Sequence, residues 1–302
     1  MPLPVVAIFG PTGVGKTAVA IALADRLRQR GEDPVAVSAD ALQVYRGLET
    51  LTGAATAAEQ ARLEHRLISF RDPSDTFSAG EYAGLAHGEI DAALGAGRTV
   101  LVVGGTGLYL QAALCDLDLR PPPAPGVRER IEAELAERGP RALHSRLAEQ
   151  APAAAAAIAP ADRSRLIRAM ELVEMGERPA AEDGESRLWT ADTRHPTLLC
   201  GLVMQRSALY EQIDSRVEAM VAAGAEDEVR RVAGAGASVT ARKALGFEEL
   251  LAGDVEAMKR HTRNYAKRQL TWMRRLGGLR TIDVTGRSPD EPAAELLGML
   301  DH

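Results

Sequence analysis

Short apolar runs alternate with helical patterns along the first third of the chain. The runs are at residues 5–9, 34–38 and 99–103, and amphipathic helical patterns at 18–30 and 78–95 separate them. This alternation is typical of right-handed βαβ units, in which parallel strands are joined through helices. We therefore predict an α/β fold with a parallel sheet flanked by helices.

The remaining chain predicts one helical insertion into that sheet. The Pro-rich stretch 119–125 (LRPPPAP) is typical of a stiff linker, and residues 177–196 are polar and irregular. The elements expected after the linker are helices at 127–138, 140–150 and 162–175, a strand at 198–203, helices between 207 and 276, and an edge strand at 280–284. We predict a core made of residues 1–120 and 198–302 and a mainly helical insertion domain at 121–197.

Composition narrows the class of protein. With 302 residues, 46% of them hydrophobic, the chain can bury a sizeable core, and no apolar run approaches the roughly 20 residues of a membrane span. The opening MPLPVVAIFG enters the first strand without a basic segment, so we expect no signal peptide. Cys115 and Cys200 are isolated, which favours two reduced thiols. We expect a cytoplasmic monomer that does not contact membranes.

A glycine-rich loop with the sequence GPTGVGKT follows the first predicted strand and opens the first predicted helix. It fills the pattern G-x-x-x-x-G-K-[ST], whose backbone N–H groups converge on a bound anion. In such a P-loop, Lys16 would reach the terminal phosphate and Thr17 would ligate Mg²⁺. A chance Gly-rich turn is the alternative. The predicted phosphate-binding residues are Gly10, Pro11, Thr12, Gly13, Val14, Gly15, Lys16 and Thr17.

The acidic residue of an ATPase is missing from its usual place. The strand 99–103 runs into Gly-Gly-Thr-Gly, whereas Asp40 follows the strand 34–38. Ligands of open α/β sheets bind at the carboxyl ends of the strands, so the loop, Asp40 and Thr106 should converge. A carboxylate and a hydroxyl beside a bound anion suit deprotonation of an acceptor. The alternative is that Asp40 only caps the segment that follows it.

Charge is distributed unevenly. The net charge of −6 argues against a nucleic-acid partner, yet residues 259–280 carry eight Lys or Arg and no Asp or Glu. On a helical wheel, Arg260, Arg263, Lys267 and Arg274 share one stripe, and the opposite side is apolar. A cationic stripe fits the phosphates of nucleic acid or of anionic lipid. The apolar side faces the core, which favours nucleic acid.

Seven motifs occur in this order along the chain: GPTGVGKT, SADALQVYRG (38–47), EHRLISFRDP (64–73), VVGGTGLYL (102–110), DRSRLIRAMELVEMG (162–176), KALGF (243–247) and KRQLTWMRR (267–275). Together they resemble the tRNA dimethylallyltransferase family, the isopentenyl transferases that modify tRNA. The resemblance implies a P-loop NTPase-like core with a helical insertion that contacts tRNA. It also implies transfer of a dimethylallyl group from dimethylallyl diphosphate to the exocyclic N6 amine of the adenine 3′ to the anticodon, with release of diphosphate.

The resemblance assigns roles to residues by position. Asp40 matches the general base, Thr106 a threonine beside the reacting centre, and Arg216 an arginine that binds diphosphate. Together with Lys16 these are the predicted catalytic residues. The residues that match tRNA-contacting segments are Asp40, Ala41, Leu42, Gln43, Thr106, Arg128, Ser164, Arg165, Leu166, Ile167, Arg168, Lys243, Ala244, Leu245, Gly246, Phe247, Glu248, Lys267, Arg268, Gln269, Leu270, Thr271, Trp272, Met273 and Arg274.

Two stretches depart from the family pattern. Residues 48–56 (LETLTGAAT) replace a Gly-Thr-Ala-Lys-Pro-like segment and lack its lysine, and Glu248 stands where some members have a basic residue.

Two other functions compete with this interpretation. A P-loop small-molecule or nucleotide kinase would use Asp40 as base for a hydroxyl, but it leaves the cationic stripe unexplained. An RNA-binding module with a nucleotide switch leaves Asp40 and Thr106 without a role.

Overall fold

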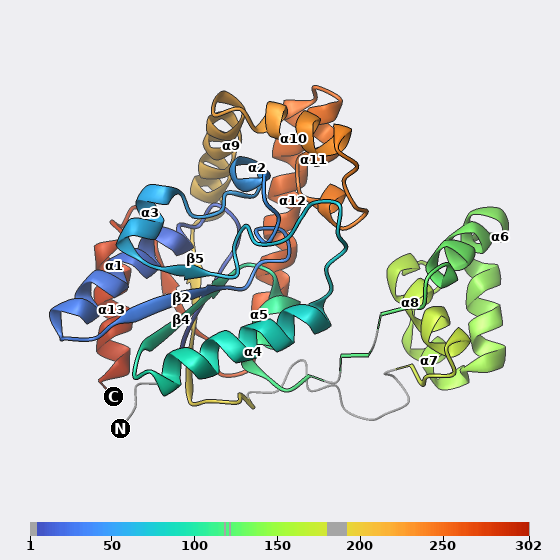
Figure 1. Cartoon of the computed structure of the whole chain (residues 1–302), viewed down its shortest axis with the longest axis horizontal. Coiled ribbons are helices and arrows are strands. Elements are labelled where there is room, and N and C mark those ends of the chain that lie inside the picture. The colour runs from blue at the N-terminus through green and yellow to red at the C-terminus, as the bar shows by residue number, and fades with distance from the viewer. Residues whose placement is uncertain (1–4, 118, 121, 180–191, 302) are drawn as a thin grey trace. The chain divides into compact units, whose positions relative to one another are not determined.

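The structure is a computed structural model that describes residues 5–117, 119–120, 122–179 and 192–301. The chain forms two compact units (Figure 1). One comprises Met1–Leu117 and Ala191–His302, and the other comprises Asp118–Thr190. The second unit thus begins and ends a few residues earlier than the insertion expected at 121–197, and most of the polar stretch 177–196 lies outside the described residues.

The first unit is built on a six-stranded parallel sheet with the order β3-β2-β4-β1-β5-β6. The strands are β1 (Val5–Phe9), β2 (Pro34–Ser38), β3 (His65–Arg66), β4 (Thr99–Gly104), β5 (Thr197–Val203) and β6 (Arg280–Asp283). The predicted α/β sheet is confirmed. The sequence did not indicate β3, because two half-buried residues show no apolar run.

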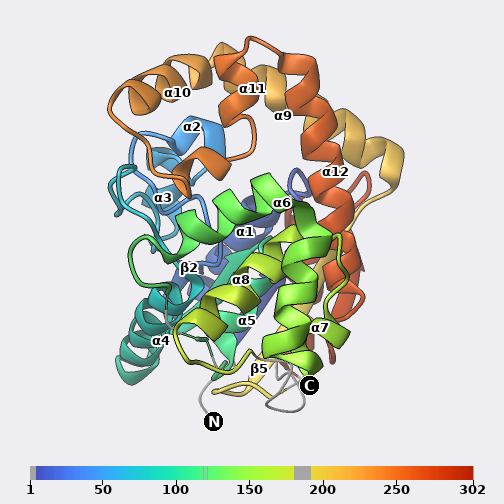
Figure 2. The ribbon, with the colours of Figure 1, turned by 90° about the vertical axis from the view of Figure 1, so that its right-hand side faces the viewer.

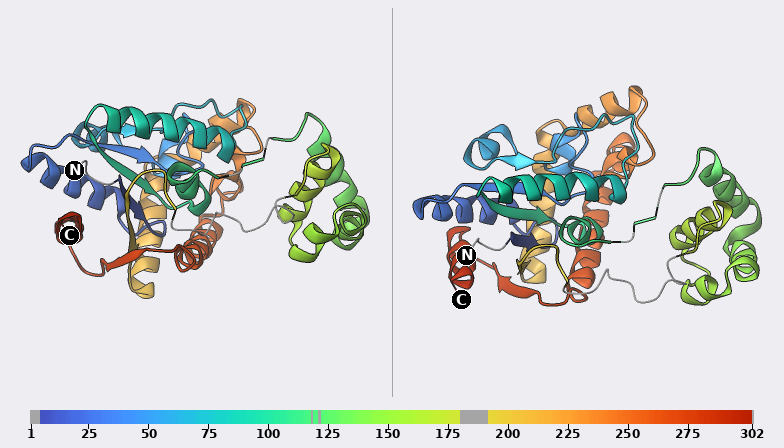
Figure 3. Two further views of the ribbon diagram at one scale, coloured as in Figure 1. Left: turned by 90° about the horizontal axis from the view of Figure 1, so that it is seen from below. Right: turned by 60° about the horizontal axis from the view of Figure 1, so that its bottom comes forward.

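Helices cover both faces of the sheet. Those of the first unit are α1 (Lys16–Gln29), α2 (Glu49–Thr52), α3 (Ala57–Arg62), α4 (Ala79–Gly95), α5 (Gly107–Leu114), α9 (Arg206–Ala222), α10 (Ala225–Gly234), the 3₁₀ turn η3 (Ala241–Lys243), α11 (Phe247–Leu251), α12 (Val255–Met273) and α13 (Asp290–Leu300). Right-handed crossovers place α1 on one face and both α4 and α5 on the other. Helix α13 packs on α1, and α12 contacts α5 and α9, an arrangement that can be followed in Figure 3.

The core follows from the apolar runs. All five residues of β1 and all five of β2 are buried, as expected for strands of a parallel sheet covered on both faces. Helix α4 begins with a capping box between Ser78 and Glu81. Helix α1 has no side-chain cap, because Gly15 precedes it with φ 93°. The N-terminal N–H groups of α1 therefore face the phosphate-binding loop.

The second unit is helical. It contains α6 (Val127–Gln150), α7 (Pro152–Ala157) and α8 (Arg163–Glu174). Helix α6 is interrupted at Gly139, with φ 79° and ψ 167°, directly before Pro140, so it amounts to two helices joined at a kink. Ile131, Leu143 and Met170 contribute to the apolar core of the second unit. No helix among the described residues is long and apolar enough to cross a membrane.

Candidate functional site

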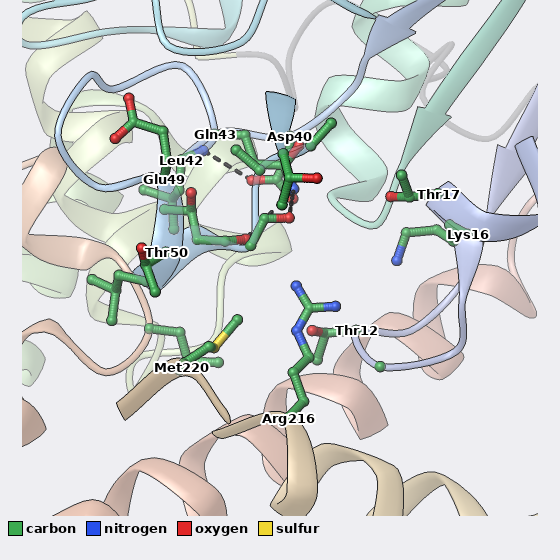
Figure 4. A pocket seen from close by; sticks show the side chains of 18 of the residues that line it. Thr12, Lys16, Thr17, Asp40, Leu42, Gln43, Glu49, Thr50, Arg216 and Met220 are labelled. Atoms are coloured by element: carbon green, nitrogen blue, oxygen red, sulfur yellow. Dashed lines mark hydrogen bonds between the residues drawn. The ribbon is translucent and has the colours of Figure 1, made fainter. Parts of the chain in front are cut away.

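The glycine-rich loop lies between β1 and α1, at the carboxyl edge of the sheet. A cavity of about 670 Å³ opens there. Its lining comes from the loop, from the segment after β2, from α2, and from α9 and α12. Figure 4 shows Lys16, Asp40 and Arg216 pointing into this cavity from three different elements. The structure therefore brings together residues that are up to 257 positions apart in the sequence, including three of the four predicted catalytic residues.

Lys16 is the first residue of α1, and its ammonium turns back onto the loop. Its Nζ donates hydrogen bonds to the carbonyl oxygens of Gly10 and Pro11, both at 3.0 Å. Burial and the nearby Arg216 lower the pKa of Lys16 to about 8, while Asp40 opposes this shift. The pKa of the Arg216 guanidinium is also lowered, first by burial. Two cations share one enclosed space, which is a favourable environment for a polyanion.

Asp40 is the second residue after β2. Its Oδ1 accepts a hydrogen bond from the backbone N–H of Leu42 at 2.9 Å, so the capping role considered from the sequence is present. The carboxyl also lines the cavity. Burial raises its pKa, although the Leu42 N–H bond and the charge of Lys16 oppose the shift. A carboxylate with a raised pKa is a stronger base, so the capping role and a catalytic role coexist.

The loop after β4 is tied to the phosphate-binding loop through α12. The Oε1 atom of Gln269 accepts from the backbone N–H of Thr12 at 2.8 Å, and its Nε2 donates to the carbonyl of Gly105 at 2.7 Å. A Cβ on Gly105 would lie 2.3 Å from Nε2 of Gln269, so a side chain there would displace this amide. The sequence places Gln269 in a tRNA-contacting segment. Its side chain is buried and instead joins two loops of the cavity.

Thr106 is the residue before α5 and contacts a second hydroxyl. Its Oγ1 lies 3.3 Å from the Tyr265 hydroxyl, which lines the cavity from α12. Burial raises the pKa of Tyr265 to about 12, so this phenol stays protonated at neutral pH. On the helical wheel, Tyr265 falls on the apolar side opposite the cationic stripe. The sequence did not indicate that its hydroxyl lies in the cavity, because this position on the wheel predicts a core side chain.

The segment 48–56 forms a wall of the cavity through α2. The Nε2 atom of Gln43 donates to the carbonyls of Thr52 and Gly53, at 3.5 and 3.2 Å, and its Oε1 accepts from Ser38 at 3.0 Å. Gln43 thus fastens α2 to the end of β2. The stretch that departs from the family pattern is therefore part of the site, which the motifs alone did not indicate.

Thr17 and Asp40 are two oxygen donors of the lining that could bind a divalent cation beside an anion. Both line the cavity, and Thr17 lies next to Lys16 in Figure 4. Hydroxyl and carboxylate oxygens suit Mg²⁺, which commonly completes its coordination with water and phosphate oxygens. In the described part of the chain no group of three or more His, Cys, Asp or Glu could hold a metal. The lining therefore fits Mg²⁺ carried by a phosphorylated ligand.

Several residues predicted to contact tRNA are enclosed. Their side chains pack in the cores of the two units, and the prediction is corrected for Leu166, Ile167, Ala244, Phe247, Gln269 and Met273. They were included because each family segment was matched as a whole, with its buried and its exposed residues together. The exposed members of these segments include Ser164, Arg165, Lys243, Lys267, Arg268 and Arg274. Glu248 is exposed and pairs with Arg242 at 2.9 Å.

The positive charges of α12 are partly neutralised by acidic residues. Lys259 pairs with Glu218 at 2.7 Å and with Glu256, and Arg263 pairs with Asp214 at 2.6 Å. The wheel could not show Glu218 and Asp214, because they come from α9. Lys267 and Arg274 are exposed, and no ion pair of theirs occurs among the residues that the structure describes. The charge available to a partner is concentrated in the second half of α12.

Arg128 and Arg168 share a buried acid in the second unit. Arg128 Nη1 and Arg168 Nη1 each lie 2.9 Å from a different carboxylate oxygen of Glu171, which is fully buried. The pair with Arg128 joins α6 to α8, whereas Arg168 and Glu171 both belong to α8. A buried carboxylate between two arginines is stable only while both pairs persist.

The chain is similar to known proteins along most of its length. A family model described as IPP transferase matches residues 43–276. A tRNA dimethylallyltransferase from Thermobifida fusca is 39% identical over 282 residues, which cover 90% of this chain and 87% of the relative.

Two solved structures share its fold. The full-length tRNA isopentenylpyrophosphate transferase from Bacillus halodurans is 33% identical with a TM-score of 0.70, over 99% of this chain and 97% of that one. A eukaryotic dimethylallyltransferase acting on tRNA has a TM-score of 0.78 at 24% identity, over 98% of this chain and 77% of that one. At the latter identity the likeness concerns the fold.

Proposed function

The chain belongs to the IPP transferase family, and we propose that it transfers a dimethylallyl group from dimethylallyl diphosphate to an adenine of tRNA. The acceptor is the exocyclic N6 amine of the adenine 3′ to the anticodon, and diphosphate is released. One observation carries the proposal: Lys16, Arg216 and Asp40 meet in one cavity, which places two cations and one base around the same space.

The two cations and the loop would bind the diphosphate. The backbone N–H groups at the start of α1, the Lys16 ammonium and the Arg216 guanidinium would receive the negative charge that develops as the C1–O bond of the donor breaks. Mg²⁺ held by Thr17 and the phosphate oxygens would add charge stabilisation when bound. Lys16 would exchange its bonds to the carbonyls of Gly10 and Pro11 for phosphate oxygens.

Asp40 would accept the proton. As N6 of adenine forms its bond to C1 of the prenyl group, the amine must lose one proton, and a carboxylate with a raised pKa in the same cavity is suited to take it. An adenine within a folded RNA reaches such a cavity only if it is drawn out of its stack. The exposed Lys267 of α12 and Arg274, which directly follows this helix, would contact the phosphates of the RNA backbone.

A direct assay tests the proposal. The protein is incubated with labelled dimethylallyl diphosphate, Mg²⁺ and total tRNA, and label in the RNA is counted. We expect label to enter tRNA and a single modified adenosine to appear after nuclease digestion. A parallel incubation with labelled ATP tests the kinase interpretation. Phosphate transfer from ATP without prenyl transfer would overturn the proposal.

A further inference from the structure

A buried acid outside the cavity holds one of its walls. Glu228 lies in the first turn of α10 and is 8% exposed. Its two carboxylate oxygens accept hydrogen bonds from the backbone N–H groups of Thr50 and Leu51, each at 3.0 Å. Both of these residues belong to α2, and Figures 1 and 2 show α10 beside α2.

Helix α2 depends on this contact. It has four residues, and Leu48 before it has no side chain that could cap it. The first N–H groups of a helix need acceptors, and an isolated helix of this length is not stable. Glu228 supplies both acceptors and a negative charge at the positive end of the helix dipole. A residue 178 positions away in the sequence from Thr50 therefore does what a local cap does elsewhere.

The other end of α2 shapes the cavity. Gly53 ends the helix with φ 59°, and a Cβ there would lie 1.8 Å from Nη2 of Arg216. The carbonyls of Thr52 and Gly53 also accept the side-chain amide of Gln43. The place of α2 therefore limits where the Arg216 guanidinium can lie.

We propose that Glu228 is a positioning residue for the donor: by anchoring α2 it fixes Arg216 against Gly53, and so sets the affinity for the diphosphate. This inference rests on the proposed function. Glu228 does not line the cavity, so it acts through α2 and not by contact with substrate. The cavity would keep its cations if α2 shifted, but Arg216 would lose the surface that holds it in place.

The test variant is Glu228→Gln, which keeps the size of the side chain but can accept only one of the two N–H bonds. We expect KM for dimethylallyl diphosphate to rise about tenfold, the equivalent of one charge-assisted hydrogen bond. The affinity for tRNA should stay the same. The matched control is Asp227→Asn on the same turn of α10. Asp227 is exposed, and its substitution removes the same charge as Glu228→Gln. An unchanged KM in a folded Glu228→Gln variant would overturn the proposal.

A double-mutant cycle separates positioning from a general loss of stability. In an Arg216→Gln background, Glu228→Gln should raise KM by less than about twofold, because the residue through which it acts is already missing. An equal penalty in both backgrounds would contradict the proposal. If Glu228→Gln does not fold, Glu228→Asp, which keeps the charge but shortens the reach, enters the same cycle. Absence of prenyl transfer in the wild-type protein would instead refute the proposed function, so the two failures are distinguishable.

Discussion

Gly53 and Arg216 lie so close together that a side chain at Gly53 would displace the Arg216 guanidinium. A Cβ built on Gly53 would lie 1.8 Å from Nη2 and 2.9 Å from Cζ of Arg216. Gly53 also has φ 59°, a left-handed conformation that disfavours other residues. Two independent constraints therefore require glycine in a segment that departs from the family pattern.

The first prediction concerns Gly53→Ala. The new methyl group should displace the Arg216 guanidinium and raise KM for dimethylallyl diphosphate about tenfold, the loss expected for one charged hydrogen bond. Gly31→Ala is the matched control, because Gly31 also has a positive φ, of 83°, but no atom within 4 Å of its Cβ position. Both variants should lose about 1 kcal/mol or more of folding free energy. Equal KM values for the two variants would show that Arg216 tolerates the methyl group.

The second prediction is for Asp40→Asn, which keeps an acceptor for the Leu42 N–H but cannot take a proton. Single-turnover prenyl transfer should fall about 10²–10⁴-fold, with the melting temperature and both substrate affinities preserved. Burial raises the pKa of Asp40 above its ordinary 3.8. As the pH is lowered, the wild-type rate should therefore begin to fall before the pH reaches 3.8. This acid limb should be absent from the variant. Near-normal turnover would leave Asp40 only its capping role.

Lys16 makes donor binding pH-dependent. With a pKa of about 8, the ammonium is more than half deprotonated above that pH, and a bound diphosphate should restore the proton. Affinity for dimethylallyl diphosphate should therefore decrease as pH rises through about 8. Calorimetry in two buffers with different ionisation enthalpies should detect proton uptake on binding. Lys16→Ala should bind weakly, transfer little, and show no such uptake, while tRNA affinity stays unchanged. Equal uptake by the variant would assign the proton to another group.

The charges of α12 can be divided by their partners. Lys267→Gln with Arg274→Gln removes two exposed charges, and the log–log salt dependence of tRNA binding should flatten by about 0.7–0.9 for each lost phosphate contact. Lys259→Gln with Arg263→Gln is the matched control, since it removes two charges that acids of α9 already neutralise. That control should leave the slope nearly unchanged. Identical slopes for the two double variants would remove the distinction between paired and unpaired cations.

Gln269→Leu tests the tether between the two loops. The substitution leaves the half-buried Thr12 N–H and the buried Gly105 carbonyl without their side-chain partner, which should cost about 1–3 kcal/mol in the free energy of unfolding. Donor affinity should fall as well, because the Thr12 N–H belongs to the phosphate-binding loop. Denaturant unfolding and donor titration measure the two effects. A stable variant with normal donor affinity would show that the loops hold their places without Gln269.

Local patterns in the sequence determined the α/β class, most strand positions and the phosphate-binding loop. Buried parallel strands are short apolar runs, and a P-loop is continuous in sequence, so both are visible without the fold. The convergence of the loop with Asp40 also followed from the sequence, because parallel strands end at one edge of a sheet. Arg216 was known only from the family resemblance, since nothing local distinguishes it from other helical arginines.

Tertiary structure alone decided which side chains face the site. Tyr265 and Gln269 lie on a helix whose polar and apolar sides both looked assigned, yet their polar atoms meet loops from β1 and β4. The pairing of Arg263 with Asp214 and the capping of α2 by Glu228 join segments remote in the chain. Such contacts depend on where helices cross. The periodicity of one helix predicts which of its faces is buried, but not which neighbouring element covers that face.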